Sequence, residues 1–130
     1  MKARIPVRAL ALLFLPCAGE YNDAIRAGLD RAQIEVRELS PGQLNATVQA
    51  CYSGNPAASP PELTPDEAVA IFCGVSDRQL DRALAALRGL PVLKAVMTET
   101  NRGWTVIALY RELCRERDAI RRQKEDGRKA

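Results

Sequence analysis

The 130-residue sequence contains no histidine. Without histidine the chain can build neither a Ser-His-Asp nor a Cys-His catalytic arrangement, and no zinc site with an imidazole ligand. It also lacks the glycine-rich phosphate loop, the GxGxxG dinucleotide motif and the HExxH metalloprotease motif. These absences exclude common hydrolase, zinc-enzyme and nucleotide-binding classes, and we expect neither a metal nor a cofactor.

Aromatic residues are also scarce, at 5%, so the core must be built from aliphatic side chains. The four cysteines are widely spaced and contain no CxxC pair. This spacing is typical of reduced thiols in a cytoplasmic protein rather than of a disulfide framework or a zinc knuckle. No apolar stretch reaches the length of a membrane span, so we expect a cytoplasmic protein without membrane contact.

The net charge of +3 belongs to the end of the chain. Residues 111–130 hold eight basic and five acidic residues, whereas the preceding residues hold eleven of each. A nucleic-acid-binding face needs a clustered basic patch with aromatic or polar readers. The sequence therefore argues against nucleic acid as a partner.

Two continuous apolar runs, residues 9–16 and 68–74, mark the organisation of the chain. Continuous rather than alternating apolarity indicates strands that are buried on both faces, as in parallel sheets. Because the first run has this later counterpart, we interpret it as a strand rather than a secretory signal. Each run precedes a helix pattern, a second strand and a further helix. The predicted strands are 9–16, 34–39, 68–74 and 92–98, and the predicted helices are 22–32, 43–52, 76–87 and 104–122.

The pattern predicts one α/β domain over residues 1–122. Its halves, 1–53 and 67–122, have similar layouts and are joined by a linker over 54–66 that contains four prolines, and residues 123–130 read as a charged flexible tail. We predict a three-layer α/β/α fold with a four-stranded parallel sheet in the order 2-1-3-4. The first and fourth helices would cover one face, and the second and third the other.

A ligand site is expected outside the carboxyl ends of the strands, where the strand order reverses. In a parallel sheet the first and third strands would end there side by side, at Cys17 and Cys73. The two thiols are then expected within a few ångströms, where they could form a redox switch. Helix starts at this edge would present N–H groups and a positive dipole end to an anion. The residues predicted to bind a ligand are Thr98, Thr100, Asn101, Arg102, Trp104, Ser76, Gly74, Cys73, Cys17 and Gly19.

Several of these positions also have a purely structural interpretation. Cys17 can be a nucleophile activated by a helix start, but the phosphatase motif C-x5-R is absent because Asp23 stands where the arginine belongs. Thr100 or Asn101 can simply cap the last helix, which leaves Thr98 and Arg102 unexplained. Ser76 and Gln79 form a capping-box pattern.

A family resemblance covers residues 67–117. The segment resembles a bacterial family of domains of unknown function, domain of unknown function 3783, through the residues Lys94, Ala95, Val96, Thr98, Thr100, Asn101, Trp104 and Thr105. The resemblance implies no activity, and the N-terminal half lies outside it.

Three hypotheses follow. The first is a non-catalytic module that binds a small anion or a protein partner at the carboxyl edge of the sheet. The second is a cysteine-dependent enzyme, for phosphoryl transfer or thiol redox chemistry, that uses Cys17. The third is a protein that dimerises through its last helix, which carries a broad apolar stripe.

Overall fold

The computed structural model describes residues 8–17, 19–61 and 63–129, with residues 125–129 as helix backbone only. Residues 1–7 of the predicted first half and residue 130 of the predicted tail lie outside this range. The elements are β1 (Leu10–Phe14), α1 (Asn22–Arg31), β2 (Glu35–Glu38), the 3-10 helix η1 (Pro41–Asn45), α2 (Val48–Ser53), β3 (Ala68–Cys73), α3 (Asp77–Ala86), β4 (Val92–Val96) and α4 (Val106–Lys129).

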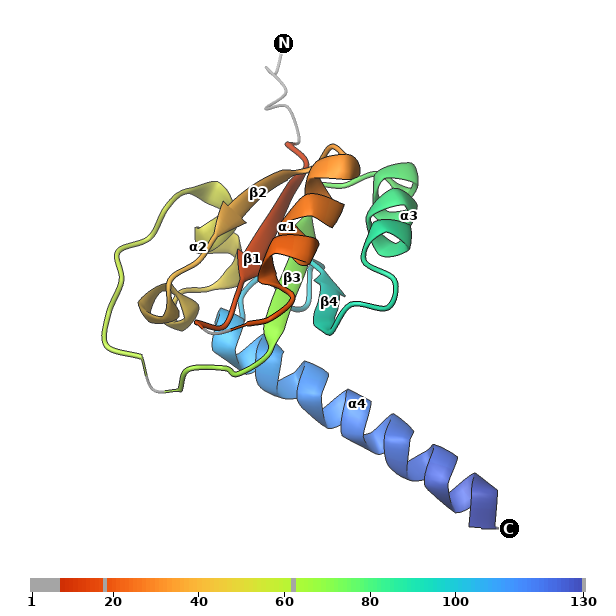
Figure 1. Ribbon diagram of the computed structural model, residues 1–130. Coiled ribbons are helices and arrows are strands. Elements are labelled where there is room, and N and C mark those ends of the chain that lie inside the picture. Colours follow the sequence, from red (N-terminus) through yellow and green to blue (C-terminus); the bar gives the residue numbers. More distant parts are fainter. Residues whose placement is uncertain (1–7, 18, 62, 130) are drawn as a thin grey trace.

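The four strands form an open sheet in the order β2-β1-β3-β4, which confirms the predicted order. The sheet is mixed, however, and the prediction of a wholly parallel sheet was wrong. β1 pairs with β2, and β3 with β4, in parallel, but β1 and β3 are antiparallel, with Leu12 opposite Ile71. The physical reason is the length of α2: six residues make a helix of about 9 Å, too short to return the chain across the sheet. The linker then enters β3 at the edge where β1 ends (Figure 1).

The helices α1 and α3 cover one face of the sheet, and α2 and α4 cover the other. One buried cluster joins α1 and α3 residues such as Leu29 and Ala83 to Leu13 and Phe72, and the second joins α2 and α4 to the opposite side chains of β1 and β3. The predicted pairing of first with fourth and second with third helices was therefore wrong. Right-handed crossovers explain the result. Relative to the β1–β2 crossover, the β3–β4 crossover runs between strands of the opposite direction and also steps toward the opposite side of the sheet. The two reversals cancel, so α1 and α3 lie on the same face.

The two halves repeat one another about an axis that crosses the sheet between β1 and β3. The α2 and α4 starts meet in an antiparallel bridge between Thr47 and Thr105. The N–H of Val48 donates to the carbonyl of Trp104, and the N–H of Val106 donates to that of Ala46, at 2.9 and 3.0 Å. The sequence shares this repeat: Thr-Val-x-Ala-x-Tyr occurs at 47–52 and again at 105–110. The first half therefore has the same architecture as the second.

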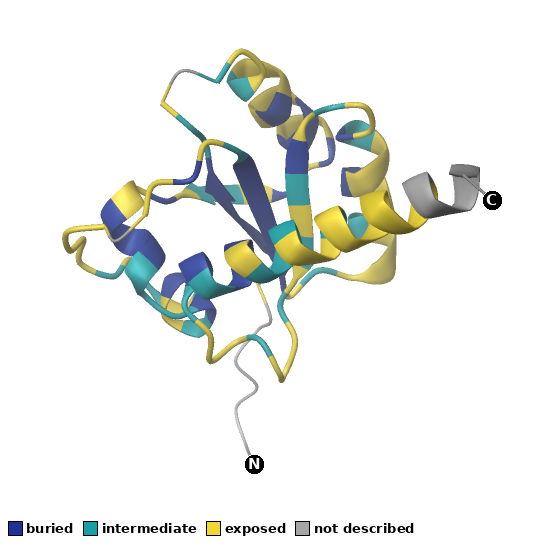
Figure 2. Ribbon diagram, turned by 90° about the horizontal axis from the view of Figure 1, so that it is seen from below, coloured by how far each residue is buried: buried dark blue, intermediate teal, exposed yellow. Residues whose placement is uncertain are grey.

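The halves differ most in their last helix. α2 ends at Ser53, whereas α4 runs on to Lys129, past its predicted end near Arg122, and extends beyond the body of the domain (Figure 1). Figure 2 shows α4 buried at its start and exposed over residues 118–124. Within the described part of the chain, no helix is both long and apolar enough to cross a membrane.

Candidate functional site

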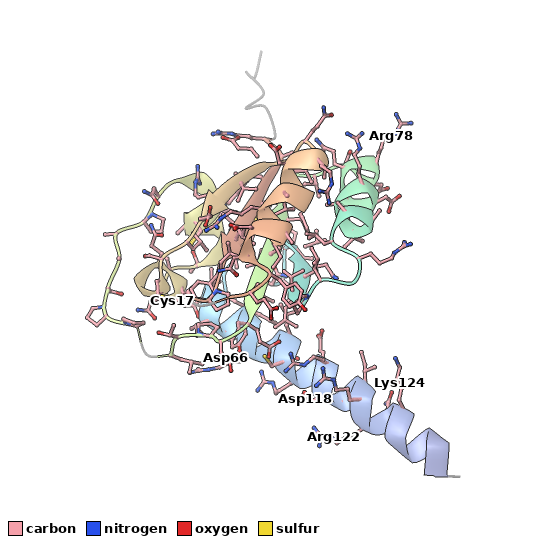
Figure 3. The ribbon with its side chains drawn as sticks, in the orientation of Figure 1. Cys17, Asp66, Arg78, Asp118, Arg122 and Lys124 are labelled. Carbon is pink, nitrogen blue, oxygen red and sulfur yellow. The ribbon has the colours of Figure 1, made fainter. Side chains whose placement is uncertain are left out.

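The antiparallel pairing of β1 and β3 separates the predicted ligand residues into two groups. Cys73 lies opposite Leu10, at the start of β1, whereas Cys17 follows the other end of that strand (Figure 3). Cys17 and Gly19 are thus at one edge of the sheet, and Cys73, Gly74 and Ser76 are at the other. The expectation that the two cysteines lie within a few ångströms was wrong, and with it the geometry of a Cys17–Cys73 redox pair.

The turn between β4 and α4 is held by two of the predicted residues, Thr98 and Asn101. The Asn101 side chain accepts the N–H of Thr98 at 2.8 Å and donates to the carbonyl of Val96 at 3.0 Å. In return the Thr98 hydroxyl accepts the N–H of Asn101 at 3.1 Å. This reciprocal arrangement is a capping box of the turn, and it gives both side chains a structural role that the sequence left open for Thr98. It does not cap α4, because that helix begins at Val106 and the Thr105 hydroxyl accepts the N–H of Ala108 at 3.2 Å. The expectation that Thr100 or Asn101 caps the last helix was therefore wrong.

The first half contains the same box at the matching place. There the Gln43 side chain accepts the N–H of Ser40 at 2.8 Å, and the two residues form a capping box at the start of η1. Gln43 is longer than asparagine, and its amide also donates to Asn55 and to the carbonyl of Pro56. The first box therefore holds the linker as well as its own turn, whereas the second is self-contained.

The other predicted residues at this edge also have local roles. Ser76 and Gln79 form the predicted capping box of α3. Gly74 has a φ of +66°, a left-handed conformation that favours glycine. Arg102 forms a surface ion pair with Glu99, with 3.3 Å between the charged atoms.

The four thiols are all free. Cys51 and Cys73 are buried, and burial raises the pKa of both thiols, to about 12 for Cys73. These two thiols stay protonated at neutral pH and are poor nucleophiles. Cys17 is exposed and Cys114 is half-buried, so Cys17 has the access that the enzyme hypothesis requires.

Two adjoining hollows lie between β4 and α4, each of about 350 Å³. The first is lined by four predicted residues, Thr98, Thr100, Asn101 and Trp104. The second lies farther along α4. Both share Lys94, Leu113 and Glu116, so the hollows form one continuous surface. We call it the β4–α4 face, defined by Leu93, Lys94, Val96, Trp104, Leu113, Glu116, Ile120, Arg121 and Lys124.

The β4–α4 face combines apolar and charged side chains. Trp104 is 37% exposed, Val96 39% and Ile120 52%, which places three large apolar groups in contact with solvent. The strand order leaves the outer side of β4 without a neighbouring strand among the described residues. An unpaired strand edge and an apolar helix stripe are both surfaces that bind polypeptide.

The sequence interpretation missed the second half of this face. Leu93, Ile120 and Lys124 were not predicted, because the last helix was expected to end with a charged tail. The repeated Thr-Val-x-Ala-x-Tyr motif is a signal that could have revealed them. Aligning the halves on that motif shows that everything after Arg111 in α4 has no counterpart in α2. Leu113 and Cys114 still pack against the core, whereas residues 118–124 are exposed and serve no part of it.

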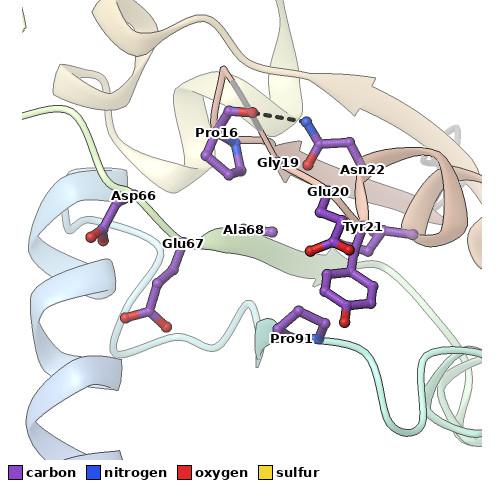
Figure 4. Close-up of a pocket in the computed structure, with 10 residues that line it drawn as sticks. Pro16, Gly19, Glu20, Tyr21, Asn22, Asp66, Glu67, Ala68 and Pro91 are labelled. Atoms are coloured by element: carbon purple, nitrogen blue, oxygen red, sulfur yellow. Dashed lines mark hydrogen bonds between the residues drawn. The ribbon is translucent and has the colours of Figure 1, made fainter.

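A third hollow, of about 230 Å³, lies at the other end of the strands, where β1 ends and β3 and β4 begin (Figure 4). Gly19, Tyr21 and Pro91 line it together with the carboxylates of Glu20, Asp66 and Glu67. The Glu67 carboxylate is already paired with Arg117 of α4. No group of three or more potential metal ligands was found within residues 8–17, 19–61 and 63–124.

Comparison with protein families finds a match for the second half of the chain. Residues 68–120 match the model of a family described as a domain of unknown function (DUF3783), which confirms the resemblance for that part of the sequence. The matched segment spans β3 to the middle of α4 and includes most of the β4–α4 face. No curated protein and no solved structure matches the chain significantly.

Proposed function

We propose that the protein is a non-catalytic module that docks a segment of a partner protein on the β4–α4 face. One observation carries the proposal: two adjoining hollows run between an unpaired strand edge and a helix that continues past the sheet. Isolated helical segments shorter than about 12–15 residues are marginal in water, so the exposed residues 118–124 of α4 would gain stability from a partner. The predicted small-anion site receives less support, because Thr98, Asn101, Ser76 and Gln79 already satisfy one another.

The first half supports the proposal by contrast. On the outer strand of that half, β2, the chain itself covers the sheet. Arg37 of β2 lies beside Leu12 of β1, and its side chain donates to the carbonyls of Cys51, Tyr52 and Gly54. In the second half, the residue on the outer strand β4 that lies beside Ile71 of β3 is Ala95, a short side chain that lines the first hollow. A long side chain and the linker thus cover one end, whereas the other end stays open to a partner.

Two alternatives are kept as separate proposals. A cysteine-dependent enzyme would use Cys17, and it requires that this thiol react with iodoacetamide much faster than a free thiol at neutral pH. A homodimer would use the apolar stripe of α4, at the half-buried Leu113 and the exposed Ile120. Sedimentation at high protein concentration separates this alternative, since the docking module is expected to be monomeric. The free thiols fit a bacterial cytoplasmic setting, which forms part of the proposal.

The test is a selection from a library of random displayed peptides against the folded protein. Ile120→Asp places a charge in the β4–α4 face, and Leu84→Asp is the matched control, because Leu84 is an exposed leucine on α3, which covers the other face of the sheet. We expect the selected peptides to bind the wild type and Leu84→Asp equally and to lose at least about tenfold in affinity for Ile120→Asp. Peptides that bind both variants equally would overturn the proposed face.

A further inference from the structure

We infer that the segment bound by the β4–α4 face is an amphipathic helix with acidic flanks. This inference rests on the proposed function and adds the chemistry of the partner. Its starting point is the apolar floor of the second hollow, formed by Leu93, Leu113 and Ile120. Leu113 and Ile120 are seven residues apart, which is two turns of one helix face and about 10 Å. An apolar stripe at the same spacing on a partner helix matches this floor.

The charges around the floor are predominantly positive. Lys94, Arg121 and Lys124 line the second hollow, and Glu116 is the carboxylate that lines it with them. A fourth cation, Arg117, is neutralised by its ion pair with Glu67. Figure 3 places Lys124 on the part of α4 that extends beyond the body of the domain, where a partner can reach it. Carboxylates beside the apolar stripe of a partner would therefore meet complementary charge.

This charge pattern also distinguishes between occupants. A second copy would bring its own cationic face against Lys94 and Lys124, and like charges across an interface oppose association. Single-stranded nucleic acid binds by stacking bases on aromatic side chains, whereas the floor of the second hollow is aliphatic. An acidic amphipathic helix matches both the apolar floor of the second hollow and the cations around it.

The experiment uses three fluorescently labelled peptides of about 15 residues, each with leucine at alternating three- and four-residue spacing. Their remaining positions carry glutamate with alanine, glutamine with alanine, or lysine with alanine. Binding to the full chain is followed by anisotropy and by the fluorescence of Trp104, the single tryptophan, which borders the first hollow. The double variant Arg121→Glu with Lys124→Glu is compared with the matched pair Arg78→Glu with Arg88→Glu, which are exposed residues on and just after α3.

We expect the glutamate peptide to bind at least about tenfold more tightly than the glutamine peptide at low salt. The lysine peptide should not bind. The Arg121 and Lys124 reversals should remove the preference, and the Arg78 and Arg88 reversals should leave it in place. Raising the salt to about 0.5 M should weaken the glutamate peptide most.

The outcomes separate the inference from the proposed function. One outcome is that the glutamine or lysine peptide binds as tightly as the glutamate peptide and loses its affinity for the Ile120→Asp variant. That result would support the docking face and refute the acidic partner. If none of the three binds, or if binding ignores Ile120→Asp, both are refuted. A dimer in sedimentation, or tighter binding of an oligonucleotide than of the glutamate peptide, would identify a different occupant and overturn the inference.

Discussion

Replacing Asn101 with alanine tests whether the predicted ligand residues of the β4–α4 turn are structural. The change removes two side-chain hydrogen bonds, one from the N–H of Thr98 and one to the carbonyl of Val96, at 2.8 and 3.0 Å. Each bond of this kind contributes about 0.5–1 kcal/mol, and the turn is partly exposed, so the expected loss is about 1.5 kcal/mol. For a domain of this size that is a fall in Tm of about 5 °C.

The measurement is urea unfolding followed by circular dichroism, with Thr100→Ala as the matched control. Thr100 lines the same hollow, but its side chain makes no hydrogen bond with another described residue, so its loss should cost less than about 0.5 kcal/mol. Gln43→Ala, at the equivalent place in the first half, should cost more than Asn101→Ala, because Gln43 is buried and also holds Asn55 and Pro56. Wild-type stability in Asn101→Ala, combined with lost peptide binding, would refute the reasoning and make Asn101 a ligand residue.

Three further predictions follow from local geometry. Gly42→Ala should destabilise the fold by about 2 kcal/mol and expose the linker to protease, because a Cβ there would lie 2.4 Å from the carbonyl oxygen of Ser59; Gly103→Ala, with open space around it, is the neutral control. Arg37→Gln should cost about 2–3 kcal/mol in urea unfolding, since three carbonyls at the end of α2 lose a charged donor, and an unchanged midpoint would contradict this. Iodoacetamide should label Cys17 in the folded protein and reach Cys51 and Cys73 only in urea, as measured by mass spectrometry. Burial raises the pKa of the Cys73 thiol from 9.0 to about 12, so its contribution to the free energy of unfolding is complete below pH 9 and is lost as the pH rises toward 12. Cys73→Ala should therefore reduce the fall in the free energy of unfolding between pH 9 and pH 12.

The sequence predicted the central strands because the two apolar runs are long and continuous, and it predicted the strand order through the rule that crossovers are right-handed. Residues 10–14 and 68–73 became the two central strands, buried on both faces, as continuous apolarity indicates. The capping box at Ser76 could be predicted as well, because a cap is a local pattern. The helix α1 begins at Asn22 as predicted, but its N-cap position is Tyr21, and no side chain caps it.

Strand direction could not be predicted in the same way. It depends on where the linker delivers the chain, and that depends on how far the second helix travels. The sequence predicted a single helix over 43–52, whereas the chain forms η1 and a six-residue α2, with Ala46 and Thr47 extended between them. The short helix reversed β3 relative to the prediction, and this single change separated Cys17 from Cys73 and moved α4 to the face covered by α2.

The predicted site residues lie together only where they belong to the same half of the chain. Thr98, Thr100, Asn101 and Trp104 are neighbours along the chain, so they stay together whichever way β3 runs. Their pairing with Cys17 and Gly19 required a parallel contact between the halves, and the mixed sheet removed it. The apolar stripe of the last helix was visible in the sequence, but its position beside β4 was not.

The most direct test of the docking face is a map of backbone amide NMR shifts on addition of the glutamate peptide to the isotopically labelled protein. We predict that the shifts concentrate along Val92–Val96, at the indole of Trp104, and on α4 from Leu113 to Lys124. The amides of α1 and α3, on the other face of the sheet, should stay unchanged. Shifts confined to α1 and α3, or to the hollow around Gly19 and Glu20, would contradict the proposal that this protein binds its partner between β4 and α4.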